Sequence, residues 1–175
     1  ENAHIYKRLA GDTPTQDFAI LRLLLAVLHT VFTRFTAKGD YYEFVVVDTE
    51  TLLVENEIDK DDIKEYREEL YETWKALWGM KQFPSIVNEY LERYRHRFNL
   101  LDKKYPFLQF PDIGEPDYPY SATDNGINKL NGRILEGDPR KPRLFMSQYQ
   151  NGLEYSTATR WLLYTNGYAP SKSGN

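Results

Sequence analysis

The sequence predicts an α+β domain that is mostly α-helical, with long irregular loops and at most a short β-hairpin. Apolar residues repeat at helical spacing in four segments, whereas Pro, Gly and Asp interrupt any regular pattern over much of residues 100–151. Aromatic residues make up 15% of the chain, which excludes a disordered protein. The 175 residues match one domain, and we expect residues 1–175 to be a piece of a larger protein because both ends look unfinished.

The first helix is predicted from Thr13 to about Thr36. Thr13 is a suitable N-cap, Pro14 suits the first helical position, and Gln16 stands where it can complete a capping box. One face of this segment is apolar and the opposite stripe is polar, so we expect a core helix with one face in water. The apolar positions are Leu21, Leu24, Leu25, Leu28, Phe32 and Phe35, and the polar ones are Arg22, His29 and Thr33.

Residues 41–59 allow two interpretations. Two runs, 44–47 and 52–54, have the composition of β-strands, and the polar residues 48–50 between them suit a turn. Neither run alternates well between apolar and polar residues. A short hairpin and an inserted loop are therefore equally supported.

Three further helices are predicted over residues 61–78, over residues 83–98, and from about Ser156 to a C-terminal Gly167. Each segment repeats apolar residues along one side. In chain order the residues on these sides are Ile63, Tyr66, Leu70, Trp74 and Leu77; Val87, Tyr90, Leu91, Tyr94 and Phe98; and Ala158, Trp161, Leu162 and Thr165.

Charge is unevenly distributed along the chain. The net charge of −4 excludes a protein that coats nucleic acid through general positive charge. Residues 43–72 hold 12 acidic and three basic side chains, whereas residues 129–143 hold five basic and two acidic ones. We interpret the acidic stretch as a solvated surface, with a docking face for a protein as the alternative, and we expect it to repel DNA.

No motif in the chain predicts catalysis. Cys is absent, and the three histidines, His4, His29 and His96, lie far apart in sequence. There is no phosphate-binding glycine loop and no nucleophile elbow. No apolar stretch approaches the length of about 18 residues that a membrane helix needs. We therefore expect no enzyme activity, no cofactor, no metal and no membrane partner.

The basic segment from Lys129 to Gln148 combines positive charge with Gly132 and Gly137. Such loops can place backbone N–H groups and side chains against phosphates or the edges of a groove. Composition alone still favours an ordinary surface loop over a nucleic-acid contact.

Several segments, in order, resemble the N-terminal region of the large subunit of the type I-E CRISPR Cascade complex, the CasA family. The similar segments span about Leu9 to Tyr168. They are residues 9–17 with 21–29, Trp74–Trp78 with Phe83-Pro84, Tyr90-Leu91 with Arg97–Leu101, Tyr105–Gln109, and Arg160–Leu163.

The resemblance implies a subunit of an RNA-guided surveillance complex for antiviral defence. Such a subunit recognises the short protospacer-adjacent motif (PAM) on double-stranded DNA, helps to form the R-loop, and recruits a helicase–nuclease. It also implies that residues 1–175 form the N-terminal domain. The implied partners are the other Cascade subunits, the guide RNA end, target double-stranded DNA and the helicase–nuclease, and the implied location is cytoplasmic.

The resemblance also implies two nucleic-acid-binding segments, one before and one after the last predicted helix. The first is the contact loop within Lys129 to Gln148, and the second is the start of a glycine-rich loop that enters the minor groove. The implied contact residues are Lys129, Asn131, Arg133, Arg140, Lys141, Arg143, Phe145, Met146, Ser147, Lys172, Ser173, Gly174 and Asn175.

Two alternatives stay open from the sequence. The chain could be a helical protein–protein interaction module that uses its acidic face and makes no nucleic-acid contact. A weaker alternative is a hydrolase whose site is completed by residues outside this chain.

Overall fold

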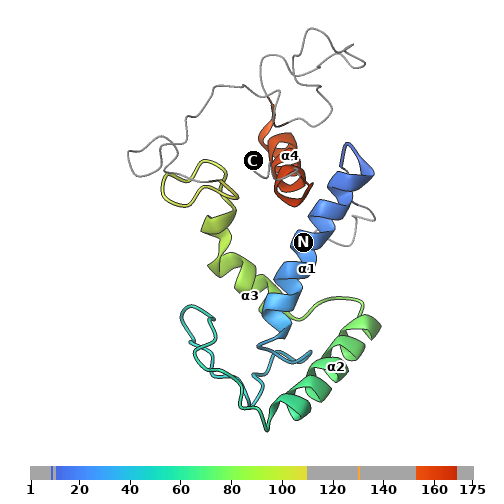
Figure 1. The fold of residues 1–175 in the computed structure, drawn as a ribbon, viewed down its shortest axis with the longest axis vertical. Coiled ribbons are helices and arrows are strands. Elements are labelled where there is room, and N and C mark those ends of the chain that lie inside the picture. The colour runs from blue at the N-terminus through green and yellow to red at the C-terminus, as the bar shows by residue number, and fades with distance from the viewer. Residues whose placement is uncertain (1–8, 10, 110–129, 131–152, 169–175) are drawn as a thin grey trace, which may run out of the picture. The chain divides into compact units, whose positions relative to one another are not determined.

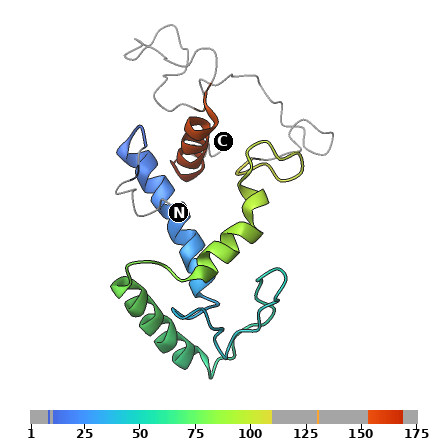
Figure 2. The same ribbon diagram turned by 180° about the vertical axis from the view of Figure 1, so that it is seen from behind.

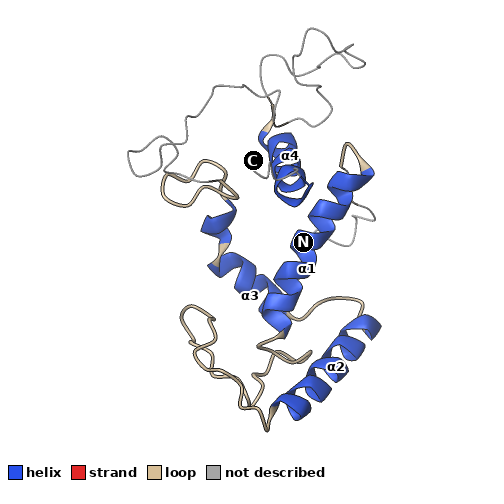
Figure 3. Ribbon diagram, in the orientation of Figure 1, coloured by secondary structure: helices blue, strands red, loops and turns tan. Residues whose placement is uncertain are grey.

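The computed structural model describes residues 9, 11–109, 130 and 153–168, and these are mostly helical (Figures 1 and 3). The elements are α1 (Pro14–Phe32), α2 (Ile63–Gly79), α3 (Ser85–Arg93), the 3₁₀ helix η2 (Arg95–Phe98) and α4 (Tyr155–Tyr168). The mostly helical prediction is confirmed, although Gly167 lies within α4 and not after it. No strand forms in the described residues, so the α+β class and the short hairpin are not confirmed.

The chain divides into two compact units, which are described separately. One unit runs from Leu23 to His96, and the other combines the described residues up to Arg22 with those from Arg97 onward. Helix α1 contributes residues to both units. The prediction of a single domain over residues 1–175 stays a prediction.

The N-terminus of α1 is capped as its sequence predicts. The Thr13 Oγ1 accepts a hydrogen bond from the backbone N–H of Gln16 at 3.2 Å. In return, Gln16 Oε1 accepts one from the backbone N–H of Asp12 at 2.7 Å. The side chains of Thr13 and Gln16 thus accept hydrogen bonds from two backbone N–H groups near the helix start. These N–H groups have no partner within the helix.

The apolar residues predicted to place α1 in a core are buried at its C-terminal part and exposed in its middle. Val31 and Phe32 are fully buried, whereas Leu21, Leu24 and Leu25 are 42%, 48% and 41% exposed. The pattern indicates which face of a helix is apolar, but it does not specify what covers that face.

Helix α1 is also long and apolar enough, by length and composition, to cross a membrane. The expectation that no stretch approaches this length was therefore wrong for Pro14–Phe32. Core helices and N-terminal signal sequences meet the same criterion. Only 22% of its apolar window is buried in the structure, and in the unit Leu23–His96 the core contacts of α1 are made by its last residues, Val31 and Phe32.

The core of the unit Leu23–His96 forms where the end of α1 meets α2 and α3, and its chain path can be followed from both sides in Figures 1 and 2. The side of α2 predicted to be apolar does face this core, through buried Leu77 and partly buried Trp74. The Trp74 ring lies 5.9 Å from the Phe32 ring and 4.7 Å from the His29 ring. The buried cluster comprises Val31, Phe32, Phe35, Ala37, Leu52, Leu77, Ile86 and Val87.

Residues 41–59 reverse direction without forming strands. A single antiparallel bridge joins Val47 to Val54. Between them, the Asp48 carboxylate accepts hydrogen bonds from the backbone N–H groups of Glu50 and Thr51 and from the Thr51 hydroxyl. These bonds lower the pKa of Asp48, the one to the Thr51 hydroxyl most. The Arg93 guanidinium donates to the carbonyl oxygens of residues 49 and 50, which ties the turn to the end of α3.

Candidate functional site

All thirteen predicted contact residues lie outside the residues that the structure describes, and they remain predictions. These residues are Lys129, Asn131, Arg133, Arg140, Lys141, Arg143, Phe145, Met146, Ser147, Lys172, Ser173, Gly174 and Asn175. The structure does describe the scaffold on either side of the two predicted contact segments. That scaffold consists of the turn at residues 99–109 and helix α4.

Helix α4 is anchored to the residues that precede α1. Trp161 is only 2% exposed, and Thr157 is also buried. The Arg160 guanidinium donates to Thr157 Oγ1 at 3.0 Å and lies 3.8 Å from a carboxylate oxygen of Asp12. Both partners of this ion pair are about one quarter exposed, so water screens them less than it screens a surface pair. The helix that follows the predicted contact loop is therefore fixed by burial and by charge.

The segment before the predicted contact loop is a compact turn. The backbone N–H of Phe107 donates to the carbonyl oxygen of Asn99 at 2.9 Å. The Gln109 side chain donates to the carbonyl oxygen of Leu100 at 2.8 Å. The Arg97 guanidinium lies over the Tyr105 ring, 4.3 Å from its centroid. These contacts give residues 99–109 a defined shape up to the point where the described chain stops.

The described residues that precede the two predicted contact segments approach each other at the C-terminal end of α4. Asn166 Nδ2, near the C-terminus of α4, lies 3.5 Å from the carbonyl oxygen of Leu108. The chain that leads to the contact loop therefore departs after Gln109 beside the end of α4. The chain that leads to the glycine-rich segment departs after Tyr168, at that same end. The described chain resumes at residue 153, and α4 begins at Tyr155, about 17 Å along the helix from Asn166 at 1.5 Å per residue.

The described residues show no arrangement typical of catalysis. No group of three or more His, Asp or Glu side chains gathers within them as a set of metal ligands. His29 packs against Trp74, and His96 stacks at 6.4 Å on Tyr94. His4 lies outside the described residues.

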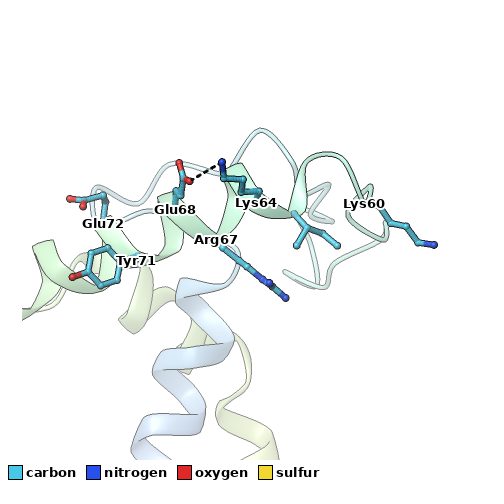
Figure 4. A pocket seen from close by; sticks show the side chains of 7 residues that line it. Lys60, Lys64, Arg67, Glu68, Tyr71 and Glu72 are labelled. Carbon is cyan, nitrogen blue, oxygen red and sulfur yellow. Dashed lines mark ion pairs between the residues drawn. The ribbon is translucent and has the colours of Figure 1, made fainter.

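One surface feature was missed by the sequence analysis. A shallow pocket of about 600 Å³ lies on α2, in the stretch interpreted above as a solvated acidic surface (Figure 4). Its lining includes three bases, of which Lys64 lies 4.0 Å from Glu68. The spacing of the bases along α2 is the signal that could have revealed it. The lining residues are Lys60, Ile63, Lys64, Arg67, Glu68, Tyr71 and Glu72.

Comparison with known proteins establishes the family. The model of the CRISPR-associated protein Cse1 family matches residues 1–175, and the chain belongs to this family. The CRISPR-associated protein CasA/Cse1 of Thermus thermophilus is 27% identical over 172 residues. That match covers 96% of this chain and 26% of the relative, so the chain spans about a quarter of the relative's length. No solved structure matches the chain. The resemblance to the CasA family is thereby confirmed.

Proposed function

We propose that this chain is the N-terminal part of the large subunit of a type I-E Cascade complex, and that it recognises the PAM on target double-stranded DNA. The subunit then helps to form the R-loop and recruits the helicase–nuclease. The observation that supports this proposal is the family match over all 175 residues. The chain acts in the cytoplasm, without a catalytic site of its own, beside the other Cascade subunits and the end of the guide RNA.

The charge of the chain supports recognition of a short DNA motif rather than strong binding to DNA of any sequence. Affinity for any DNA sequence comes from neutralised phosphates, and a net charge of −4 provides few of these contacts overall. In an RNA-guided complex, base pairing with the guide reads most of the target, while protein reads only a short motif. The basic segment at residues 129–148 meets that smaller requirement.

The scaffold supports the same proposal. Asn166, near the C-terminus of α4, lies beside Leu108, so the described chain on the way to each of the two predicted contact segments passes close to the other. Burial of Trp161 and the ion pair of Arg160 anchor α4, the helix that separates the two predicted contact segments in the chain.

The experiment changes Lys141→Ala and Arg143→Ala together in a large subunit containing this chain, assembled with its guide and partner subunits. We expect binding of duplexes that carry the PAM to weaken about tenfold or more, because each lost base or phosphate contact costs about 1–3 kcal/mol. Binding is measured by titration on assembled complex purified by size-exclusion chromatography. The matched control is Lys38→Ala with Lys81→Ala, which removes two positive charges from exposed positions elsewhere. Wild-type binding and assembly by the first variant would remove residues 129–148 from the proposal.

A second candidate is a protein-interaction module that touches no nucleic acid. It is favoured by the exposed carboxylates Glu65, Glu68 and Glu69 on α2. Reversing all three charges to Lys and measuring co-purification with the other subunits tests it. Loss of co-purification, combined with unchanged DNA binding by the Lys141/Arg143 variant, would favour this candidate over PAM recognition.

A further inference from the structure

The apolar face of α1 is buried at one end of the helix and exposed at the other. Steps of three and four residues place its large apolar side chains on one side of a single helix. Toward the C-terminus this side enters the core, since Phe32 is fully buried and Leu28 packs against the same cluster. Toward the N-terminus its side chains lie in water, and Phe18 is 53% exposed. We call the exposed half, which extends about 10 Å, the bare stripe of α1. It consists of Phe18, Leu21, Leu24 and Leu25.

The first half of α1 buries its small and polar residues and exposes its large apolar ones. In the unit that also contains α4, Ala19 is 5% exposed and Gln16 is fully buried. Phe18 and Leu21, in the same turns of the helix, are exposed. Removing a Phe or Leu side chain from water releases more free energy than removing an Ala side chain, because more apolar area is buried. The reversed order therefore indicates that the bare stripe has a cover outside the described residues.

Helix α4 ends beside this stripe. The ring of Tyr168, the last residue of α4, lies 6.5 Å from the ring of Phe18. Arg22 Nη1 lies 3.6 Å from the place that a Cβ atom at Gly167 would occupy. The chain that follows α4 therefore starts at the edge of the bare stripe (Figure 1). The relative of known family is long enough to supply a cover, since the match spans only 26% of its length.

The stripe suits the same polypeptide better than a second protein. It continues without a break into a core that this chain builds from its own α2 and α3. About half the surface of four side chains falls short of the roughly 800 Å² per partner that a specific protein interface buries. A segment of the same chain needs less area, because its effective concentration is high before any contact forms. Residues 110–151 are interrupted by Pro and Gly, which suits a loop better than an element that lies along a helix.

We propose that a segment of the same subunit, from beyond residue 175, packs along the bare stripe of α1. Its apolar side chains contact Phe18, Leu21, Leu24 and Leu25 and extend the core that begins at Leu28. Residues 1–175 then form only part of a folding unit, whose boundary lies further along the subunit. This inference rests on membership of a longer subunit and not on PAM recognition, and its tests use no DNA.

The first test places the photo-reactive residue p-benzoylphenylalanine at position 24 of the full-length subunit, purified alone as a monomer. Irradiation attaches this residue to the segment that covers the stripe, and mass spectrometry identifies the attached peptide. We expect a peptide of the same polypeptide from beyond residue 175. The matched control carries the photo-reactive residue at position 26, where Ala26 is exposed on the opposite side of α1, and should not attach to that peptide. Attachment to residues 1–8, to residues 110–152 or to a second copy would overturn the proposal, as would the absence of any attachment.

The second test compares two substitutions at exposed positions of α1 in the full-length subunit. Leu24→Gln should lower the melting temperature by about 3 °C or more, because a covered Leu side chain loses its apolar contacts. Ala26→Gln, two residues away, should change it by less than about 1 °C, as a substitution at a surface position does. Thermal unfolding of both variants beside wild type provides the comparison. Equal melting temperatures for the two variants would show that Leu24 stays in water and that the stripe has no cover.

Discussion

Two tyrosine hydroxyl groups join the end of α1 to α2 in the unit Leu23–His96. The Tyr42 hydroxyl donates to Thr73 Oγ1 at 2.7 Å, and both residues are buried. The Tyr66 hydroxyl donates to the carbonyl oxygen of Thr33 at 2.7 Å. Burial raises the pKa of both tyrosines above their ordinary value, because the charged phenolate is poorly solvated there. The two hydrogen bonds fix the position of α2 relative to the end of α1 within an otherwise apolar core.

These shifts predict a loss of stability at alkaline pH. A pKa raised in the folded state means that the folded protein holds protons that the unfolded chain has lost. The stabilisation is therefore complete below about pH 10, the ordinary value for tyrosine, and falls as the pH rises above it. Tyr42→Phe should lower the free energy of unfolding by about 1 kcal/mol at pH 7.5, because Thr73 loses its partner. Urea unfolding at pH 7.5 and pH 10.5 should show a smaller pH dependence in this variant than in wild type. An unchanged pH dependence would contradict the role given to Tyr42.

At the scale of elements, the helices and the polar turn at residues 48–50 were predictable, whereas the structure of the two runs beside that turn was not. The spacing of apolar residues predicts each helix because one face must enter a core. The strand-like run at residues 44–47 failed to form a strand because a side chain supplies the bonds that a neighbouring strand would make. Asn56 Oδ1 accepts from the N–H of Val46 at 2.7 Å, and Asn56 Nδ2 donates to the carbonyl of Phe44 at 3.0 Å. Composition does not reveal such long-range side-chain bonds.

The capping residues of α1 allow a direct test at this scale. Thr13→Ala removes the acceptor for the N–H of Gln16 and should lower the free energy of unfolding by about 1 kcal/mol. Thr13→Ser keeps the hydroxyl and should retain nearly all of the stability. Thermal unfolding followed by circular dichroism at 222 nm provides the comparison. Equal melting temperatures for the Ala and Ser variants would show that the cap contributes nothing.

At the scale of the whole molecule, the candidate site was predicted from the resemblance to the CasA family and not from a pattern of residues in the sequence. No periodicity marks residues 129–148 as a contact loop, since their basic composition also suits an ordinary surface loop. The scaffold around them was easier to predict, because Trp161 and its neighbours repeat at helical spacing.

The most direct test of the central claim asks whether residues 129–148 touch the target duplex. We would place p-benzoylphenylalanine at Phe145 in the assembled complex, with the same residue at Tyr155, the exposed first residue of α4, as the control. Irradiation with a labelled duplex should attach position 145 to DNA at or next to the PAM, and a duplex with a mutated PAM should reduce this attachment about tenfold. Attachment of position 145 only to protein, or equally to both duplexes, would contradict the account.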